Sequence, residues 1–110
     1  MIYLAAPYND FDKSIICDRM DKIYAVIAFL TNNGNHVVTP LLMHEIVIRY
    51  EIDGSFNFWE KYCIDLLSRC DKLYVLMIDD WDTRHGIKKE IEYAIDNNIE
   101  VVYINHEDFS

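Results

Sequence analysis

The segment from Val75 to Glu90 combines residue types that could bind a ligand and react with it. An apolar run ends at Ile78, an acidic and aromatic loop follows, and a helix is predicted from Gly86. In α/β folds, ligands bind at the carboxyl ends of parallel strands, where this loop would lie. Glu90 comes four residues after Gly86, about one helical turn later, and could point back to the same crevice. The segment therefore predicts a pocket with a carboxylate inside it.

Glu90 is the first candidate for the reactive group. A carboxylate near a helix N-terminus is stabilised electrostatically, which would keep it ionised and available as a nucleophile or base. The alternative is an ordinary solvated glutamate in a first helical turn, a common placement. Spacing alone favours this ordinary glutamate.

The loop before the helix holds further candidates for ligand binding. Asp79, Asp80 and Asp82 are crowded together, and carboxylates that lie close together can raise one another's pKa. They could equally be ordinary loop acids. Trp81 could stack on a base or a sugar, or it could cover the rim of the core.

Other candidates come from the remaining elements. Tyr3 lies in the first predicted strand, and Tyr8 and Asn9 follow it. The two tyrosine hydroxyls could orient a ligand. His44 could face the crevice or be a hydrogen-bonded structural residue. Asp65 lies on a predicted helix and could point to the rim or to water.

The sequence predicts neither a metal nor a cofactor. The histidines form no HxH or HExxH pattern, which argues against a metal site; they are His36, His44, His85 and His106. The chain also lacks the GxSxG, GxGxxG and P-loop motifs, so serine hydrolase, dinucleotide-binding and P-loop functions are not indicated.

The elements that position these residues alternate between strand and helix. Apolar runs predict strands at 2–6, 36–39, 72–78 and 100–104. Helical periodicity predicts helices at 11–32, 58–70 and 86–97, and residues 43–50 could also be helical. Asn9 or Asp10 could cap the first helix, and Asn33-Gly34 should end it. This alternation predicts one α/β domain over residues 1–110, with a mainly parallel, flavodoxin-like or Rossmann-like sheet of four or five strands in three α/β/α layers.

Length and charge narrow the classes of function. A chain of 110 residues suits one domain. The net charge of −9 argues against binding to duplex nucleic acid or to an anionic membrane. Three cysteines without metal-type spacing indicate reduced thiols. With neither a signal peptide nor a membrane span predicted, a cytoplasmic protein is expected.

The chain resembles the nucleoside 2-deoxyribosyltransferase-like superfamily, which includes transferases, nucleotide N-glycoside hydrolases and small phage and bacterial proteins. The resemblance covers nearly the whole chain. It rests on IYLAAPY at 2–8, Arg19, Gly34, VTPLLMH at 38–44, Trp59, Cys70-Asp71, Trp81 and GIKKEIEYA at 86–94. Their order and spacing together are typical of that fold.

The resemblance implies a role for three residues. A glutamate at the position of Glu90 attacks the anomeric carbon of the sugar, the base leaves, and water or a second base resolves the glycosyl-enzyme, much as in retaining glycosidases. Tyr3 would hold the nucleophile, and Asp65 would bind the leaving base or protonate it. Family members often complete the pocket across a subunit boundary, which implies a homo-oligomer.

Arg84 departs from the family pattern. Transferases carry an acid at this position, and many nucleotide hydrolases carry a serine. Its guanidinium could bind two oxygens of a phosphate through parallel hydrogen bonds, or it could pair with Glu90 and lower the reactivity of that carboxylate.

Three hypotheses follow. The first is an enzyme that cleaves or exchanges the N-glycosidic bond of a nucleotide or nucleoside. The second is a protein that binds and sequesters a nucleotide-derived signal without turnover, of the ADP-ribose or cyclic nucleotide type, as in phage counter-defence. The third is a structural or partner-binding domain with a vestigial site.

Overall fold

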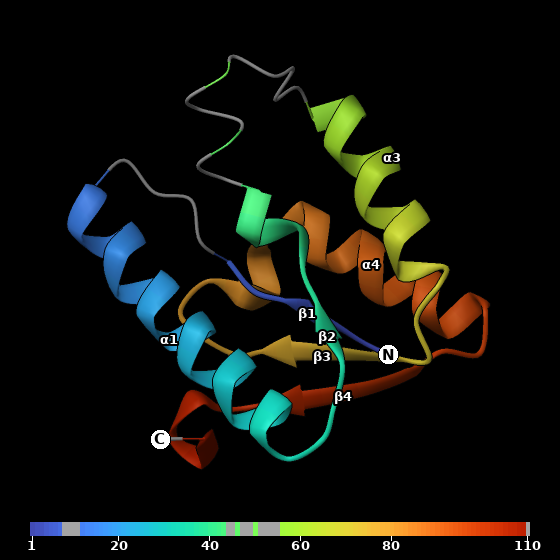
Figure 1. Ribbon diagram of the computed structural model, residues 1–110. Helices are drawn as coiled ribbons and strands as arrows, with labels where there is room; N and C mark the ends of the chain where they lie inside the picture. Colours follow the sequence, from blue (N-terminus) through green and yellow to red (C-terminus); the bar gives the residue numbers. More distant parts are fainter. Residues whose placement is uncertain (8–11, 44–45, 47–49, 51–55, 110) are drawn as a thin grey trace.

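The central sheet has its strands in the order β2-β1-β3-β4 (Figure 1). The computed structural model describes residues 1–7, 12–43, 46, 50 and 56–109. Within them the strands are β1 (Ile2–Ala5), β2 (Val37–Val38), β3 (Lys72–Leu76) and β4 (Glu100–Ile104). Every pairing is parallel, and β1 has a neighbour on each side. The predicted parallel sheet is confirmed, with four strands in the described residues.

Helices cover both faces of this sheet. The helix α1 (Lys13–Asn32) lies on one face, and α3 (Phe56–Leu67) and α4 (His85–Asp96) lie on the other (Figure 1). Short 3-10 helices lie in the connections: η1 (Pro40–Met43), η2 (Trp81–Thr83) and η3 (His106–Phe109). The layers are α/β/α, as predicted, and the strand order is of the flavodoxin-like type.

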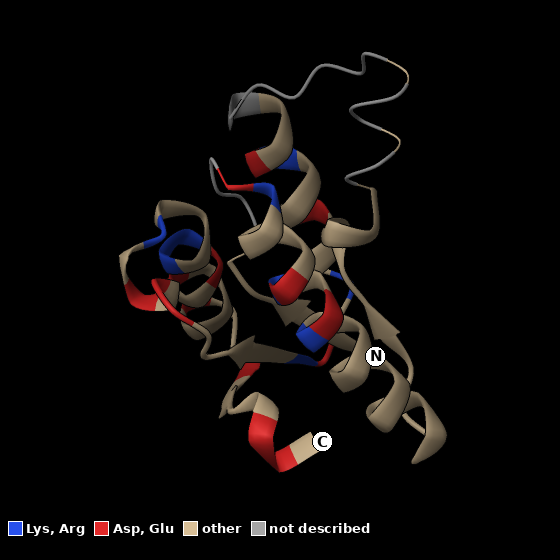
Figure 2. Cartoon of the chain, turned by 90° about the vertical axis from the view of Figure 1, so that its left-hand side faces the viewer, with Lys and Arg blue, Asp and Glu red and all other residues tan. Residues whose placement is uncertain are grey.

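The pleat of the strands divides the core into two apolar clusters. Along β1, Leu4 points toward α1, whereas Tyr3 and Ala5 point toward α3 and α4. In β3, Leu76 and Leu73 divide between the faces in the same way, because successive side chains of a strand point to opposite faces. Charged residues lie mainly on the helices and loops (Figure 2).

The first helix begins two residues later than predicted. It starts at Lys13 because the Asp12 side chain accepts a hydrogen bond from the Ser14 backbone N–H at 2.9 Å and so caps it. The predicted caps, Asn9 and Asp10, lie outside the described residues. The predicted end is confirmed, since α1 is followed by a glycine with a φ of 88°.

The other boundaries differ by a few residues. The predicted strand 72–78 ends at Leu76, because the chain then turns and the Ile78 backbone N–H donates to the Leu76 carbonyl at 2.9 Å. The helix predicted at 58–70 ends at Leu67, after which the Ser68 hydroxyl bonds the Asp65 carbonyl. Most of the possible helix at 43–50 lies outside the described residues. Among the helices described, none is long and apolar enough to cross a membrane.

Substitution of a buried strand leucine tests the assignment of the core. Leu4 is fully buried, so Leu4→Ala should lower the free energy of unfolding by about 3 kcal/mol, through lost transfer energy and a cavity. Urea denaturation monitored by circular dichroism measures this change. Leu42→Ala is the matched control, because Leu42 is 50 % exposed and its loss should cost less than about 0.5 kcal/mol. Equal losses in the two variants would contradict the assignment.

Candidate active site

Three titratable side chains from β1, α3 and α4 meet on one face of the sheet. Tyr3 points from β1 toward the two helices. Glu90 lies on the buried stripe of α4 with Ile87 and Ala94, since residues three and four apart share a helix face. Cys63 packs against the same cluster from α3. The three groups lie close together, because Tyr3 interacts with both of the others.

The Glu90 carboxyl group is buried and keeps its proton to a higher pH than a glutamate in water. The residue is 9 % exposed, and its Oε2 makes no hydrogen bond within the described part of the chain. Burial raises the pKa of Glu90 from 4.5 to about 7, and the Tyr3 hydroxyl opposes this rise only in part. Burial thus outweighs the stabilisation expected from the helix N-terminus, and a pKa of about 7 leaves the carboxyl group only about half ionised at pH 7. Glu90 is the sixth residue of α4, and the helix dipole acts mainly within the first turn.

Tyr3 contributes a neutral phenol. Its side chain is fully buried, and its Oη makes no hydrogen bond of normal geometry to any residue that the structure describes. Burial and then the nearby Glu90 and Cys63 raise the pKa of Tyr3 far above its usual range. Buried polar atoms nearly always have partners, so the two atoms in this cluster could accept or donate hydrogen bonds to a ligand.

Cys63 is the third member of the cluster and was not predicted. Its side chain is half-buried, and burial raises the pKa of its thiol to about 11, so the thiol is neutral at pH 7. The signal that could have found it is helical phase. Cys63 and Leu67 are four residues apart and share the face of α3 that covers the sheet, and Cys70 follows three residues after the end of the helix in the same cluster.

Asp65, the predicted partner from α3, points to water. It comes two residues after Cys63, which is about 200° around a helix. Its carboxylate lies 3.5 Å from the Arg69 guanidinium, and both side chains are at least 70 % exposed. Asp65 also lines an open groove of about 670 Å³, together with Tyr93 of α4. The structure therefore brings Tyr3 and Glu90 together without Asp65.

The loop after β3 is held by an arginine from the opposite helical layer. Arg19 of α1 is 5 % exposed, and its Nη2 lies 3.5 Å from both the Asp79 carbonyl oxygen and the Asp80 carboxylate. Asp80 has a φ of 72°, and its carbonyl accepts hydrogen bonds from the Thr83 N–H and hydroxyl. Arg19 is one of the residues that carry the family resemblance, but its contact with this loop was not predicted.

Trp81 covers the rim of the core, one of its two predicted roles. It begins η2, is half-buried, and packs against the cluster beneath α3 and α4. Its ring lies 5.5 Å from that of Tyr103 on β4. Stacking of Trp81 on a ligand stays a prediction.

Arg84 and Gly86 lie at the start of α4. Arg84 is its half-buried N-cap residue, and it is not among the groups that shift the pKa of Glu90. The pairing of Arg84 with Glu90 stays a prediction. Gly86 belongs to the helix, as predicted, and a Cβ added there would meet nothing within 4 Å among the described residues. The packing of these residues does not require a glycine at this position.

Three predicted ligand-binding residues, Tyr8, Asn9 and His44, lie outside the described residues, so their roles stay predictions. Within the parts of the chain that the structure describes, no three His, Cys, Asp or Glu side chains gather in a way that could hold a metal ion.

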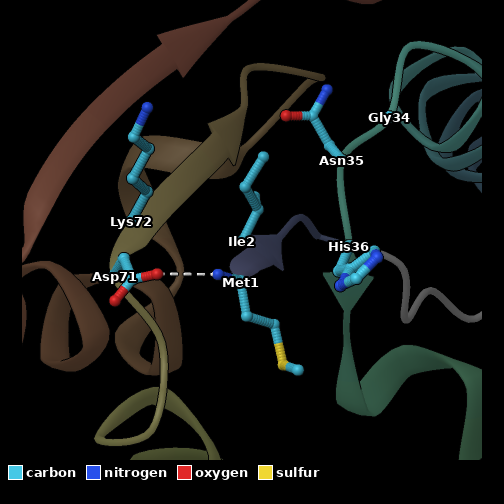
Figure 3. Close-up of a pocket in the computed structure, with 7 residues that line it drawn as sticks. All are labelled: Met1, Ile2, Gly34, Asn35, His36, Asp71 and Lys72. Carbon is cyan, nitrogen blue, oxygen red and sulfur yellow. Dashed lines mark hydrogen bonds and ion pairs between the residues drawn. The ribbon is translucent and has the colours of Figure 1, made fainter.

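A separate hollow of about 290 Å³ lies at the amino ends of the strands (Figure 3). The Met1 amino group there bonds the Asp71 carboxylate at 2.8 Å. The lining residues are Met1, Ile2, Gly34, Asn35, His36, Asp71 and Lys72. This hollow is at the opposite edge of the sheet from the loop between β3 and α4, so it does not belong to the candidate site.

Residues 1–106 match the family described as "Domain of unknown function (DUF1937)". The match covers nearly the whole chain, and the protein therefore belongs to this family. None of the curated proteins matches it.

Burial of Glu90 should make stability depend on pH. Below pH 4.5 the carboxyl group is protonated in the folded and unfolded chain alike. Between pH 4.5 and 7 the unfolded chain releases a proton that the folded chain keeps. The free energy of unfolding should therefore fall by about 3 kcal/mol as the pH rises through this window, and level off above it. Glu90→Gln should remove this dependence and be the more stable protein at pH 8.

Urea denaturation from pH 4 to pH 8.5 measures the free energy of unfolding of the wild-type protein and of Glu90→Gln as a function of pH. Glu92→Gln is the control, since Glu92 is exposed on the same helix and should keep the wild-type pH dependence. A Glu90→Gln variant that follows the wild-type curve would show that Glu90 titrates as it does in water.

Proposed function

We propose that this member of the DUF1937 family cleaves or exchanges the N-glycosidic bond of a nucleotide or nucleoside, with Glu90 as the nucleophile. One observation carries the proposal: the buried Glu90 Oε2 and Tyr3 Oη lie in one cluster, and neither has a hydrogen bond in the described part of the chain. The resemblance to nucleoside 2-deoxyribosyltransferase-like proteins supplies the type of reaction.

The reaction would proceed by two displacements at the anomeric carbon. A Glu90 oxygen forms a bond to this carbon as its bond to the base nitrogen breaks, and the electron pair of that bond leaves with the base, which takes up a proton. Water or a second base then displaces Glu90, so the configuration at the sugar is retained. The neutral Tyr3 hydroxyl can donate a hydrogen bond to the carboxylate and hold it for attack.

The start of α4 suits the phosphate of a nucleotide. Arg84 is six residues before Glu90, or about 9 Å along a helix axis, which leaves room for a sugar between them. The first N–H groups of α4 have no side-chain cap from Arg84, and both a helix N-terminus and a guanidinium attract phosphate. The open space at Gly86 would let a ligand approach the backbone there.

A base-release assay tests this function. Incubation with a panel of nucleoside monophosphates and nucleosides should liberate free base, measured by chromatography. The rate at low substrate concentration should rise with pH and level off above about pH 7, because the attacking group must be ionised.

Glu90→Gln should lower that rate by at least about 10³-fold, because it removes the nucleophile. Glu92→Gln, on the exposed side of the same helix, should release base at the wild-type rate. Release of no base by the wild-type protein from any member of the panel would exclude the proposed reaction.

A second function is favoured by the raised pKa of Glu90. Below about pH 7 this carboxyl group keeps its proton, and in that form it can exchange hydrogen bonds with a ligand without attacking it. This behaviour suits a protein that binds and sequesters a nucleotide-derived signal of the ADP-ribose or cyclic nucleotide type.

Calorimetric titration with ADP-ribose and with nucleoside monophosphates tests this alternative. Glu90→Gln should still bind, whereas Arg84→Gln should weaken binding of a phosphorylated ligand by about 10- to 100-fold, the worth of a charge-assisted hydrogen bond. Lys88→Gln removes the same charge from an exposed position on α4 and should have little effect. Unchanged affinity in the Arg84 variant would remove Arg84 from the site.

A further inference from the structure

Cys63 packs from α3 against the cluster that contains Tyr3, and its thiol interacts electrostatically with the Tyr3 hydroxyl. Cys63 belongs to the apolar stripe that includes Leu67, and it packs against the cluster that contains Tyr3. The hydroxyl thus has a carboxyl group from α4 and a sulfur from α3 as neighbours. It is the group that connects the other two.

We propose that Cys63 is a positioning residue of this site, whose sulfur competes with the Glu90 carboxyl group for the single proton of the Tyr3 hydroxyl. The inference rests on the proposed function, because it takes Tyr3 and Glu90 as the reacting site. It adds a role for a residue that lies outside the predicted machinery.

The chemistry of sulfur explains why a thiol suits this position. A phenol has one proton to donate, and a thiol sulfur is a weak acceptor compared with a hydroxyl or carboxylate oxygen. The sulfur therefore draws the Tyr3 proton from Glu90 without holding it firmly. A ligand can then accept a hydrogen bond from the Tyr3 hydroxyl without breaking a strong one. This agrees with a Tyr3 Oη that makes no normal hydrogen bond in the described residues.

Few of the described groups near Glu90 could change its titration when Cys63 is substituted. The titratable side chains in or against this cluster are Tyr3 on β1, Cys63 on α3, Cys70 after α3 and Tyr93 on α4. Of these, Tyr3 and Cys63 interact with Glu90. Asp65 of α3 points to solvent, and Trp81 of η2 and Leu73 of β3 present uncharged side chains to the same cluster. A change at Cys63 should thus reach Glu90 through the Tyr3 hydroxyl.

Two substitutions of Cys63 should move the pKa of Glu90 in opposite directions. Cys63→Ala removes the competing acceptor, so Tyr3 donates to the carboxylate and the titration of Glu90 should move about one pH unit lower. Cys63→Ser supplies a stronger acceptor, so the titration should move upward. A purely structural role would give shifts in the same direction, because both substitutions shrink the side chain.

The titration of Glu90 can be followed without substrate, by the pH dependence of urea unfolding and by carbon NMR of labelled glutamate carboxyl groups. Cys17→Ala and Cys17→Ser are the controls, since Cys17 is exposed on α1, and neither should move it. In a Tyr3→Phe background, both Cys63 shifts should disappear.

Shifts in the same direction, shifts that survive in Tyr3→Phe, or the absence of any shift would overturn the role of Cys63. Because these readouts need no turnover, they are separate from the base-release assay. Base release with an unmoved titration would leave the proposed function standing and remove this inference. Opposite shifts without base release would support the placement of Cys63 and remove the proposed reaction.

Discussion

The structure depends on β1 being buried on both faces. This strand lies between β2 and β3, with α1 on one side of it and α3 and α4 on the other. Because successive side chains of a strand must point to opposite faces, Leu4 enters the layer of α1 and Tyr3 enters the other layer. The pleat thus sends the one polar side chain of β1 to the same layer as Glu90.

The polar cluster in that layer has a cost in stability. The ionised form of Glu90 is stabilised by water. The packing of α4 on the sheet removes that water, so the carboxylate form is destabilised in the folded protein. Tyr3 and Glu90 both bury oxygen atoms that have no hydrogen bond in the described chain. Costs of this kind are often found where binding or catalysis is retained at the expense of stability, which agrees with the proposed role of this cluster.

Arg19 links the two helical layers at the edge where the site lies. Its guanidinium crosses from α1 to the loop after β3, at 3.5 Å from Asp79 and Asp80. The Asp80 side chain is 60 % exposed, so solvent screens the ion pair and its energy is small. Its effect is to fix the position of the loop that leads through Trp81 to the start of α4.

The sequence by itself determined the elements and their order. Apolar runs and helical periodicity predicted the strands and helices to within a few residues, because the spacing of apolar residues reflects which side chains are buried in the core. It also indicated Glu90 and Tyr3 through the family resemblance. What it could not show is that the face of α3 with Cys63 packs against the cluster that contains Tyr3, while Asp65 lies in water, because this depends on how the helix docks on the sheet.

The protonation of Glu90 was likewise decided only by the tertiary structure. Position along a helix predicted an ionised carboxylate, but the packing of α4 on the sheet buries the group and raises its pKa to about 7. The contact between Arg19 of α1 and Asp80 in the loop after β3 also cannot be predicted from the residues around either one in the sequence. Local patterns report whether a side chain is apolar or charged, whereas desolvation and long-range contacts depend on what the rest of the chain packs around it.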